Sequence, residues 1–195
     1  MERSASVQRH TKETQVNLAV LLDGTGVQKI STGIPFFNHM LSLFATHGFF
    51  DLSIQATGDI EVDFHHTVED VGIVLGTAVS KALGNRQGIR RYGYAVTPMD
   101  EALSRVAIDL SNRPFLVFHA PPVPPAETGF GVQLAKEFFR AFATHCGMTL
   151  HIEVAYGENE HHVIESIFKA VARALDMASA PDERIVGALS TKGCI

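Results

Sequence analysis

Histidine and glutamate residues at a fixed spacing are the groups in this chain best suited to chemistry. The pattern His-His-x-x-Glu occurs twice, as His65, His66 and Glu69 and again as His161, His162 and Glu165. Residues four apart in a helix differ in direction by only about 40°, so the first histidine and the glutamate of each segment form a chelating pair. The second histidine points about 100° away. We therefore expect each segment to serve two metal ions, with its second histidine on a different ion.

The two segments lie at corresponding places of an internal repeat. Residues 44–54 (FATHGFFDLSI) match residues 142–152 (FATHCGMTLHI), and each block is followed by its His-His segment and an apolar helical stretch. Self-similarity of this kind indicates a duplicated structural unit. The sequence therefore predicts two halves, residues 1–93 and 94–195, that form one compact unit with two pseudo-equivalent metal sites.

The repeat nominates two further metal ligands. His39, in PFFNHM, corresponds to Glu137, in KEFF. His47 and His145 also correspond, but both lie at predicted helix ends, where a histidine can complement the helix dipole instead. The other histidines have no partner spacing, and we interpret them as surface or strand residues: His10, His119 and His151. Nitrogen and carboxylate donors without a thiolate suit Mn, Fe or Zn better than Mg or Ca.

Each half must supply the elements that hold these residues. The alternating segments VNLAVLLDGTG and RVAIDLSNRPFLVF, with turn signals at DG and SNRP, predict a hairpin at the start of each half. Helices are then predicted over 35–47 and 131–146, strands over 50–56 and 148–155, longer helices over 65–83 and 161–177, and a proline-rich loop over 119–130. The expected fold is an α+β duplicated two-layer module. Each half is a mixed sheet with two helices on one face, and the halves pack through their helical layers.

Composition argues against several classes of function. The chain has 195 residues, 46% of them hydrophobic, which is enough for a core that needs no disulfide. A net charge of −5 argues against nucleic acid as a partner. No apolar stretch approaches the roughly 20 residues of a membrane span, and the polar N-terminus has no hydrophobic signal region. Cys146 and Cys194 lack CxxC spacing, so we expect a cytoplasmic protein without a membrane partner.

Several segments together resemble the imidazoleglycerol-phosphate dehydratase family of histidine biosynthesis: PFFNHMLSLFATHG, DFHHTVEDVGI, PMDEAL, LSNRPFL, ENEHHVIESIFKA and the STKG tail. The resemblance runs from about Arg9 to Gly193, without a fused phosphatase segment, and so implies the monofunctional form. It implies a hydro-lyase that converts imidazoleglycerol phosphate to imidazoleacetol phosphate. It also implies two Mn²⁺ per active site, with other divalent first-row metals as alternatives. The implied assembly is a homo-oligomer of 24 subunits, built from trimers, with active sites between subunits.

The resemblance also implies roles for individual residues. The implied metal ligands are His39, His65, His66, Glu69, Glu137, His161, His162 and Glu165. Many relatives have a histidine where this chain has Glu137. Glu13, in TKET, corresponds to the catalytic glutamate, and Glu165 is the second carboxylate that we assign to catalysis. The implied phosphate-binding set is Arg91, Arg113, Ser190, Thr191 and Lys192, and the other implied substrate contacts are Glu13, His39, His47, His65, Glu69 and His161.

The chemistry of this reaction explains why such a site would be needed. The glycerol carbon next to the ring must lose hydroxide, although its neighbouring C–H is not acidic. A metal-bound imidazolate could expel the hydroxyl group and leave a diazafulvene-like intermediate. A carboxylate base, for which we nominate Glu13, would then remove the adjacent proton to give an enol that becomes the ketone.

Two other classes of protein could carry these histidines. A two-metal hydrolase would hold its ions about 3.5–4 Å apart, but the Asp-rich ligand sets that build such bridges are absent from this sequence. A metal-storage or scaffold protein could also be rich in histidine. In such a protein the Ser-Thr-Lys tail and the two arginines would have no task.

Overall fold

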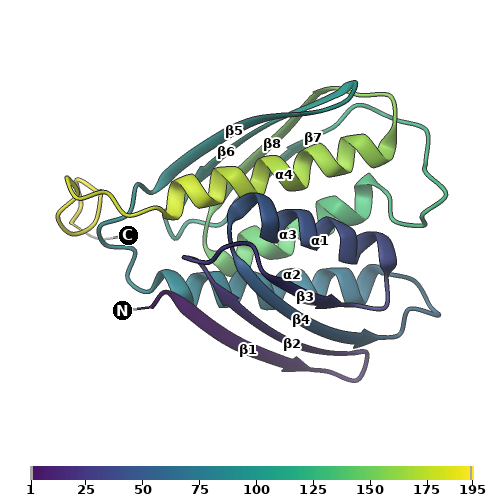
Figure 1. Ribbon diagram of the computed structural model, residues 1–195, viewed down its shortest axis with the longest axis horizontal. Coiled ribbons are helices and arrows are strands. Elements are labelled where there is room, and N and C mark those ends of the chain that lie inside the picture. Colours follow the sequence, from purple (N-terminus) through teal and green to yellow (C-terminus); the bar gives the residue numbers. More distant parts are fainter. Residues whose placement is uncertain (1, 194) are drawn as a thin grey trace.

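The computed structural model describes residues 2–193 and residue 195. These residues form two four-stranded sheets and four helices (Figure 1). The first sheet is formed by β1 (Ser4–His10), β2 (Thr14–Leu21), β3 (Gln28–Ser31) and β4 (Asp51–Gly58). The second is formed by β5 (Tyr92–Met99), β6 (Ala102–Asp109), β7 (Phe115–His119) and β8 (Thr149–Tyr156). The helices are α1 (Pro35–Gly48), α2 (His65–Leu83), α3 (Val132–Cys146) and α4 (Glu160–Ser179). Within these described residues, no helix combines the length and the apolar character that a membrane crossing needs.

The two sheets have the same topology, which confirms the duplicated mixed-sheet module. Their strand orders are β1-β2-β4-β3 and β5-β6-β8-β7. In each sheet the first two pairs are antiparallel and the last pair is parallel. The predicted helices and the predicted strands of 50–56 and 148–155 are present, with small shifts at their ends.

Each half opens with a hairpin, but the signals DG and SNRP do not form its turn. The hairpins are β1–β2 and β5–β6. Strand β4 lies between β2 and β3, and β8 lies between β6 and β7. The strands that flank DG and SNRP therefore belong to crossovers, because alternation tells which face a side chain takes but not which strand lies alongside.

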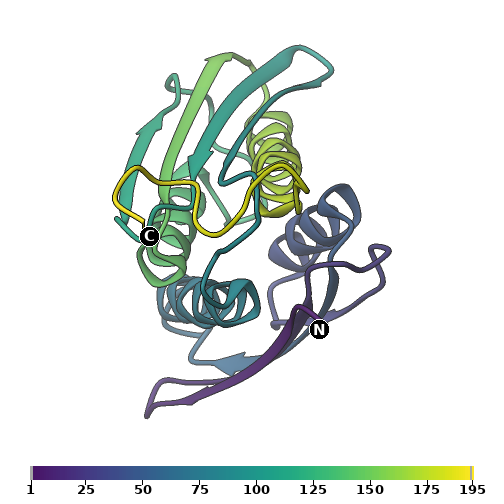
Figure 2. The ribbon, with the colours of Figure 1, turned by 90° about the vertical axis from the view of Figure 1, so that its left-hand side faces the viewer.

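All four helices lie between the two sheets (Figure 2). Helix α2 covers β1 and β2, and α4 covers β5 and β6. Across the halves, α2 packs on α3 and α1 packs on α4. This arrangement confirms that the halves pack through their helical layers.

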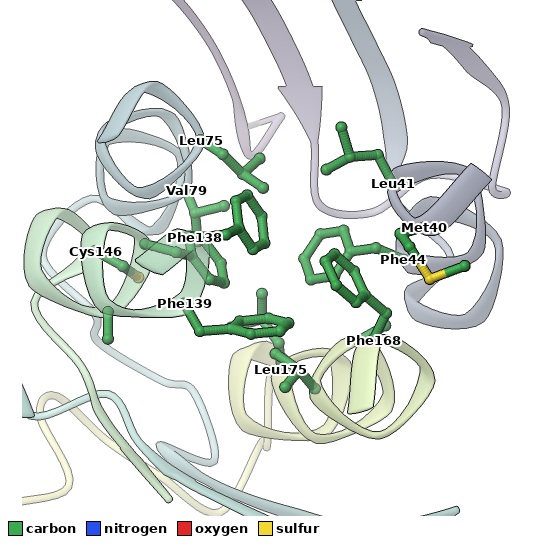
Figure 3. Packing of buried hydrophobic residues seen from close by; sticks show 14 of the residues in the cluster. Met40, Leu41, Phe44, Leu75, Val79, Phe138, Phe139, Cys146, Phe168 and Leu175 are labelled. Carbon is green, nitrogen blue, oxygen red and sulfur yellow. The ribbon is translucent and has the colours of Figure 1, made fainter. Parts of the chain in front are cut away.

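Aromatic side chains fill the space where the four helices meet (Figure 3). Phe138 of α3 stacks on Phe168 of α4 with ring centroids 5.4 Å apart. Phe44 of α1 meets Phe142 of α3 edge to face at 5.8 Å, a geometry that aromatic pairs prefer. These rings are fully buried. The core therefore joins the halves and fixes the helices that carry the His-His segments.

A side chain just before each of those helices accepts the backbone N–H group of the segment's first histidine. The side chain of Asp63 accepts the backbone N–H of His65 at 2.7 Å. The N-cap residue Asn159 accepts the backbone N–H of His161 at 2.9 Å. Such side chains satisfy N–H groups that a helix start leaves without partners. Each His-His segment consequently occupies the first turn of its helix.

Candidate metal centre and phosphate pocket

One group of three potential metal ligands gathers atoms from both halves. His39 comes from α1, and His161 and Glu165 come from α4. Their ligand atoms all lie within 4.8 Å of one another. Oε2 of Glu165 is 3.2 Å from Nε2 of His161 and 3.7 Å from Nε2 of His39. The i, i+4 pairing is as predicted, and α1 brings the further histidine to it.

Glu165 is the buried member of this group, and a lysine holds its other oxygen. Nζ of Lys169, one turn along α4, lies 2.5 Å from Oε1 of Glu165. Burial raises the pKa of Glu165, but the hydrogen bond and charge of Lys169, with His161 and His39, outweigh it. The pKa of Glu165 therefore lies below its ordinary value. Oε2 is left facing the two histidines as an ionised acceptor.

The corresponding group of the first half is built differently. Nε2 of His65 is 3.8 Å from Oε2 of Glu69, again at i, i+4 spacing on α2. Arg140 of α3 forms an ion pair with Glu137 and lies 3.6 Å from Oε1 of Glu69. Glu137 therefore reaches this region, and a guanidinium lies between its carboxylate and that of Glu69.

The second histidine of each segment contacts a carboxylate outside the motif. Nδ1 of His66 is 2.9 Å from Oδ2 of Asp59, and Nδ1 of His162 is 2.6 Å from Oε2 of Glu101. The hydrogen bond to Asp59 raises the pKa of His66. Hydrogen bonds from His162 and from backbone N–H groups, including that of Asn159, lower the pKa of Glu101 to about 2. Neither histidine joins the group formed by its own neighbour.

Adjacent histidine rings are also turned away from each other. The rings of His65 and His66 have centroids 6.2 Å apart and planes inclined by 88°. Those of His161 and His162 are 6.0 Å apart and inclined by 73°. This orientation agrees with the expectation that neighbouring histidines serve different ions.

Glu13 lies at the same end of the molecule. It belongs to the turn between β1 and β2, and its Oε2 is 3.9 Å from Nδ1 of His66. Its side chain is 58% exposed. Apart from this long contact, Glu13 makes no side-chain ion pair among the described residues.

The remaining histidines lie in the last turns of helices or in strands. His47, in the last turn of α1, is partly buried, and burial followed by the charges of Lys169 and Arg173 lowers its pKa. His145, in the last turn of α3, contacts the carbonyl of Ala141 in its own helix at 3.0 Å. The histidines without partner spacing are exposed strand residues, as expected: His10, His119 and His151.

The predicted phosphate-binding residues line one pocket of about 910 Å³. Arg91, Arg113, Ser190, Thr191 and Lys192 contribute to it, together with Arg184. Asp109 holds the guanidinium of Arg91 through contacts of 2.6 and 3.0 Å. The guanidinium of Arg113 lies 3.4 Å from Asp109 and is largely exposed. The pocket therefore offers a fixed guanidinium, exposed cations and hydroxyl groups, which together suit an anionic group.

This pocket and the candidate metal ligands lie at opposite ends of α4. The backbone N–H of Arg91 donates to the carbonyl of Ala178 near the helix C-terminus, whereas His161 lies in the first turn. Seventeen residues of helix separate these two points, a distance of about 25 Å. Figure 1 shows the C-terminal segment beside one end of α4 and the loop before α4 at the other.

Five residues beside the predicted ones were not predicted from the sequence: Lys169, Arg140, Asp59, Glu101 and Arg184. Lys169 stands four residues after Glu165, so the helical spacing could have revealed it. Arg140 stands three residues after Glu137 and carries the same kind of signal. Asp59 lies in a loop seven residues before His66, and Glu101 lies in a loop 61 residues before His162. No periodic pattern marks either position.

Comparisons with known proteins identify the family of this chain. Residues 32–175 match the model of the family described as imidazoleglycerol-phosphate dehydratase. The chain is 80% identical to the imidazoleglycerol-phosphate dehydratase of Desulfosudis oleivorans, over the full length of both chains.

Solved structures with the same fold carry the same family name. The imidazoleglycerol-phosphate dehydratase of Staphylococcus aureus is 39% identical, with a TM-score of 0.83 over 92% of this chain and 99% of that one. The IGPD of Pyrococcus furiosus, solved in complex with (S)-C348, is 36% identical, with a TM-score of 0.84 over 97% of this chain and 100% of that one. The chain therefore belongs to the imidazoleglycerol-phosphate dehydratase family, whose dehydratase name denotes a hydro-lyase.

Proposed function

We propose that this chain catalyses the dehydration of imidazoleglycerol phosphate to imidazoleacetol phosphate in histidine biosynthesis. The observation that carries the proposal is the group formed by His39, His161 and Glu165, whose ligand atoms lie within 4.8 Å of one another. The duplicated segment with His65 and Glu69 supplies a second half-site. The full-length identity of 80% to a dehydratase supports the same substrate.

The donor atoms fit manganese. Imidazole nitrogen and carboxylate oxygen suit divalent first-row metals, and no thiolate lies among the candidate ligands. Glu165 supports the fit, because its ionised Oε2 faces two histidines while Lys169 occupies only Oε1. We propose two Mn²⁺ per active site, held by His39, His65, His66, Glu69, Glu137, His161, His162 and Glu165. When bound, the ions would stabilise the anionic form of the substrate's imidazole ring.

Glu13 is the proposed general base. Expulsion of the hydroxyl group would leave a diazafulvene-like ring system, from which a carboxylate must remove the proton of the neighbouring carbon. The Glu13 side chain is exposed, and within the described part of the chain its one charged contact is the long one to His66. Glu165 is the second catalytic carboxylate of the site, but Lys169 and two histidines already occupy its oxygens. The free carboxylate of Glu13 is therefore better placed to accept a proton.

The basic pocket is the proposed phosphate site. Asp109 and the carbonyl of Leu189 fix the guanidinium of Arg91 and leave two of its five N–H groups to donate to a ligand. Arg113, Ser190, Thr191 and Lys192 would close around the phosphate from the other sides of the pocket. His39, His47, His65, Glu69 and His161, with Glu13, would contact the ring and glycerol portion.

Separation of the two regions supports an oligomer with shared active sites. A small phosphate ester cannot span the roughly 25 Å between the first turn of α4 and the pocket beside its end. One copy would therefore supply metal ligands and another the phosphate pocket. We propose a closed homo-oligomer of 24 subunits built from trimers, located in the cytoplasm. Within each subunit, residues 1–93 and 94–195 would fold as one unit through the shared helical core.

A turnover assay tests this function. Protein stripped of metal and reloaded with Mn²⁺ should convert imidazoleglycerol phosphate to imidazoleacetol phosphate. It should leave generic phosphate esters intact. Hydrolysis of such esters without dehydration would favour a two-metal hydrolase, and Mn²⁺ uptake without any turnover would favour a storage protein.

A further inference from the structure

The second histidines of the two segments are each held by a carboxylate that is not a proposed metal ligand. Nδ1 of His66 contacts Asp59 at 2.9 Å, and Nδ1 of His162 contacts Glu101 at 2.6 Å. A carboxylate can only accept, so each Nδ1 must carry the proton. In the neutral ring Nε2 then carries the lone pair, and in His162 this atom lies 3.8 Å from Oδ2 of the exposed Asp100.

The two carboxylates come from different places of the repeat. Strands β1 and β2 pair in the same register as β5 and β6, with Ser4 opposite Leu21 and Tyr92 opposite Asp109. In this alignment the counterpart of Glu101 is Glu13, since each directly precedes the second strand of its hairpin. The counterpart of Asp59, which follows β4, is Gly157, which follows β8. Asp59 is therefore present in one half only.

Three hydrogen bonds hold the carboxylate of Glu101. Besides His162, its carboxylate accepts the backbone N–H groups of Glu158 at 3.1 Å and Asn159 at 2.8 Å. Among the described residues, the one charged partner of the Glu13 side chain is His66, at 3.9 Å. At the same position of the repeat, the second half therefore has a carboxylate held by hydrogen bonds, whereas the carboxylate of the first half has a long contact with His66 instead.

In the first half, Asp59 provides the close carboxylate contact to the second histidine. Its Oδ2 meets His66, whereas its buried Oδ1 has no hydrogen-bond partner within the described part of the chain. Backbone contacts already hold this loop, through Asp59 N–H to Glu13 and Val62 N–H to Asp59. The hydrogen bond of the Asp59 side chain is therefore made to His66, while the loop itself is held by backbone hydrogen bonds.

We propose that Asp59 and Glu101 are positioning residues that orient His66 and His162 toward the metal ions. In the first half Asp59 performs the task that Glu101 performs in the second, and this leaves Glu13 free for proton transfer. The inference rests on the proposed metal centre. A carboxylate on the far nitrogen of a ligating histidine fixes its tautomer and ring and raises its basicity.

The test compares Mn²⁺ affinity among variants of the full chain. Protein stripped with a chelator is titrated with Mn²⁺ in a calorimeter for wild type, Asp59→Asn and Glu101→Gln. Each amide keeps the shape but loses the charge, and we expect one ion to bind about 10–100-fold more weakly in each variant. The matched controls are Glu61→Gln and Glu158→Gln, which neutralise exposed carboxylates beside the same contacts and should bind both ions as wild type does.

A second readout separates positioning from general damage or from catalysis. Turnover of Asp59→Asn and Glu101→Gln should recover most of its loss at saturating Mn²⁺, whereas turnover of Glu13→Gln should not. Thermal unfolding in the presence of chelator identifies any variant that fails to fold. If one of the two variants does not fold, the Mn²⁺ affinity of the other one tests the proposal.

The possible outcomes are distinct. If wild type binds no Mn²⁺, the proposed metal centre fails and the positioning role fails with it. If wild type binds two ions and folded Asp59→Asn and Glu101→Gln bind them equally well, the metal centre stands and the positioning role is wrong.

Discussion

Nζ of Lys169 lies 2.5 Å from Oε1 of Glu165, one turn earlier on α4. The lysine therefore places a positive charge beside the buried carboxylate of the candidate ligand group. Both side chains are largely buried, at 16% and 8% exposure, so water screens this charge only weakly. A metal ion that binds Glu165 must approach an ammonium group, and Lys169 should weaken that binding.

Replacement of Lys169 tests this competition. We expect Lys169→Met to bind Mn²⁺ about tenfold more tightly at low salt, because one repulsive charge is removed. The metal-free protein should at the same time lose about 1.5–3 kcal/mol of stability, the usual worth of a charged hydrogen bond. Titration calorimetry and denaturant unfolding measure the two effects. Lys136→Met, at an exposed position of α3, is the control, and equal affinity in wild type and Lys169→Met would show that the lysine does not compete.

The role of Glu13 can be tested by an isosteric change. Glu13→Gln should bind Mn²⁺ and substrate as wild type does but lose about two to four orders of magnitude in kcat, because an amide cannot accept a proton. Steady-state kinetics with a metal titration measures this. Arg113→Ala gives a contrast, since a lost phosphate contact should chiefly raise KM. Near-normal kcat in Glu13→Gln would move the base to Glu165.

Shared active sites can be tested by co-assembly. His162→Ala should disable metal binding, and Arg113→Ala should weaken the phosphate pocket. The assay is run at substrate concentrations far below the KM of Arg113→Ala, where that variant is nearly inactive. If these residues meet across subunits, particles co-expressed from equal amounts of both variants should then regain up to about a quarter of wild-type activity, because that share of sites draws both intact residues from different chains. Differential tags allow mixed particles to be purified and assayed. Mixed particles no more active than the parent variants would mean that each chain builds its own site.

The sequence could predict the paired ligands because helix periodicity and the repeat are local signals. His65 with Glu69 and His161 with Glu165 lie four residues apart, and helix geometry alone puts each pair on one face. The repeat then indicated His39 through its counterpart Glu137. The same signals gave the two-layer module, since each half repeats the order of helices and strands.

Contacts made by loop residues could not be predicted in this way. Asp59 precedes His66 by seven residues and Glu101 precedes His162 by 61, but both are loop residues, and loop positions carry no periodic pattern. The crossovers at DG and SNRP were missed for a related reason, since the insertion of β4 and β8 between their flanking strands is decided by the sheet as a whole. Arg140 beside Glu137 was missed although its i, i+3 spacing was visible in the sequence.

The close contact of α2 with α3 gives a prediction about stability. A Cβ atom at Gly76 would lie 2.6 Å from the carbonyl oxygen of Phe142 and 2.9 Å from the amide nitrogen of Cys146. These backbone atoms cannot move without displacing α3. Gly76→Ala should therefore destabilise the protein by about 1–3 kcal/mol, although the same change in an open helix would stabilise it by about 1 kcal/mol. Chemical denaturation measures this, with exposed Lys81→Ala of α2 as the control.

Cys146, which is fully buried at the end of α3, gives a prediction about alkaline pH. Burial raises the pKa of its thiol to about 12, against an ordinary value of 9.0 and despite the nearby charge of Arg86. A raised pKa means that the folded protein keeps the proton while the unfolded chain releases it. This contribution to stability is complete below pH 9 and is lost as the pH rises toward 12, by about 1.4 kcal/mol for each pH unit.

Two measurements check the behaviour of Cys146. Iodoacetamide at pH 8 should leave Cys146 unmodified in the native protein and alkylate it fully in denaturant, as read from its own peptide by mass spectrometry. Unfolding free energies from pH 8 to 10.5 should fall less steeply for Cys146→Ala than for wild type, because the variant lacks the buried thiol that ionises only on unfolding. Other groups that titrate in this range are present in both proteins, so the difference between the two slopes isolates Cys146. Rapid alkylation of the native protein, or parallel slopes, would contradict the raised pKa.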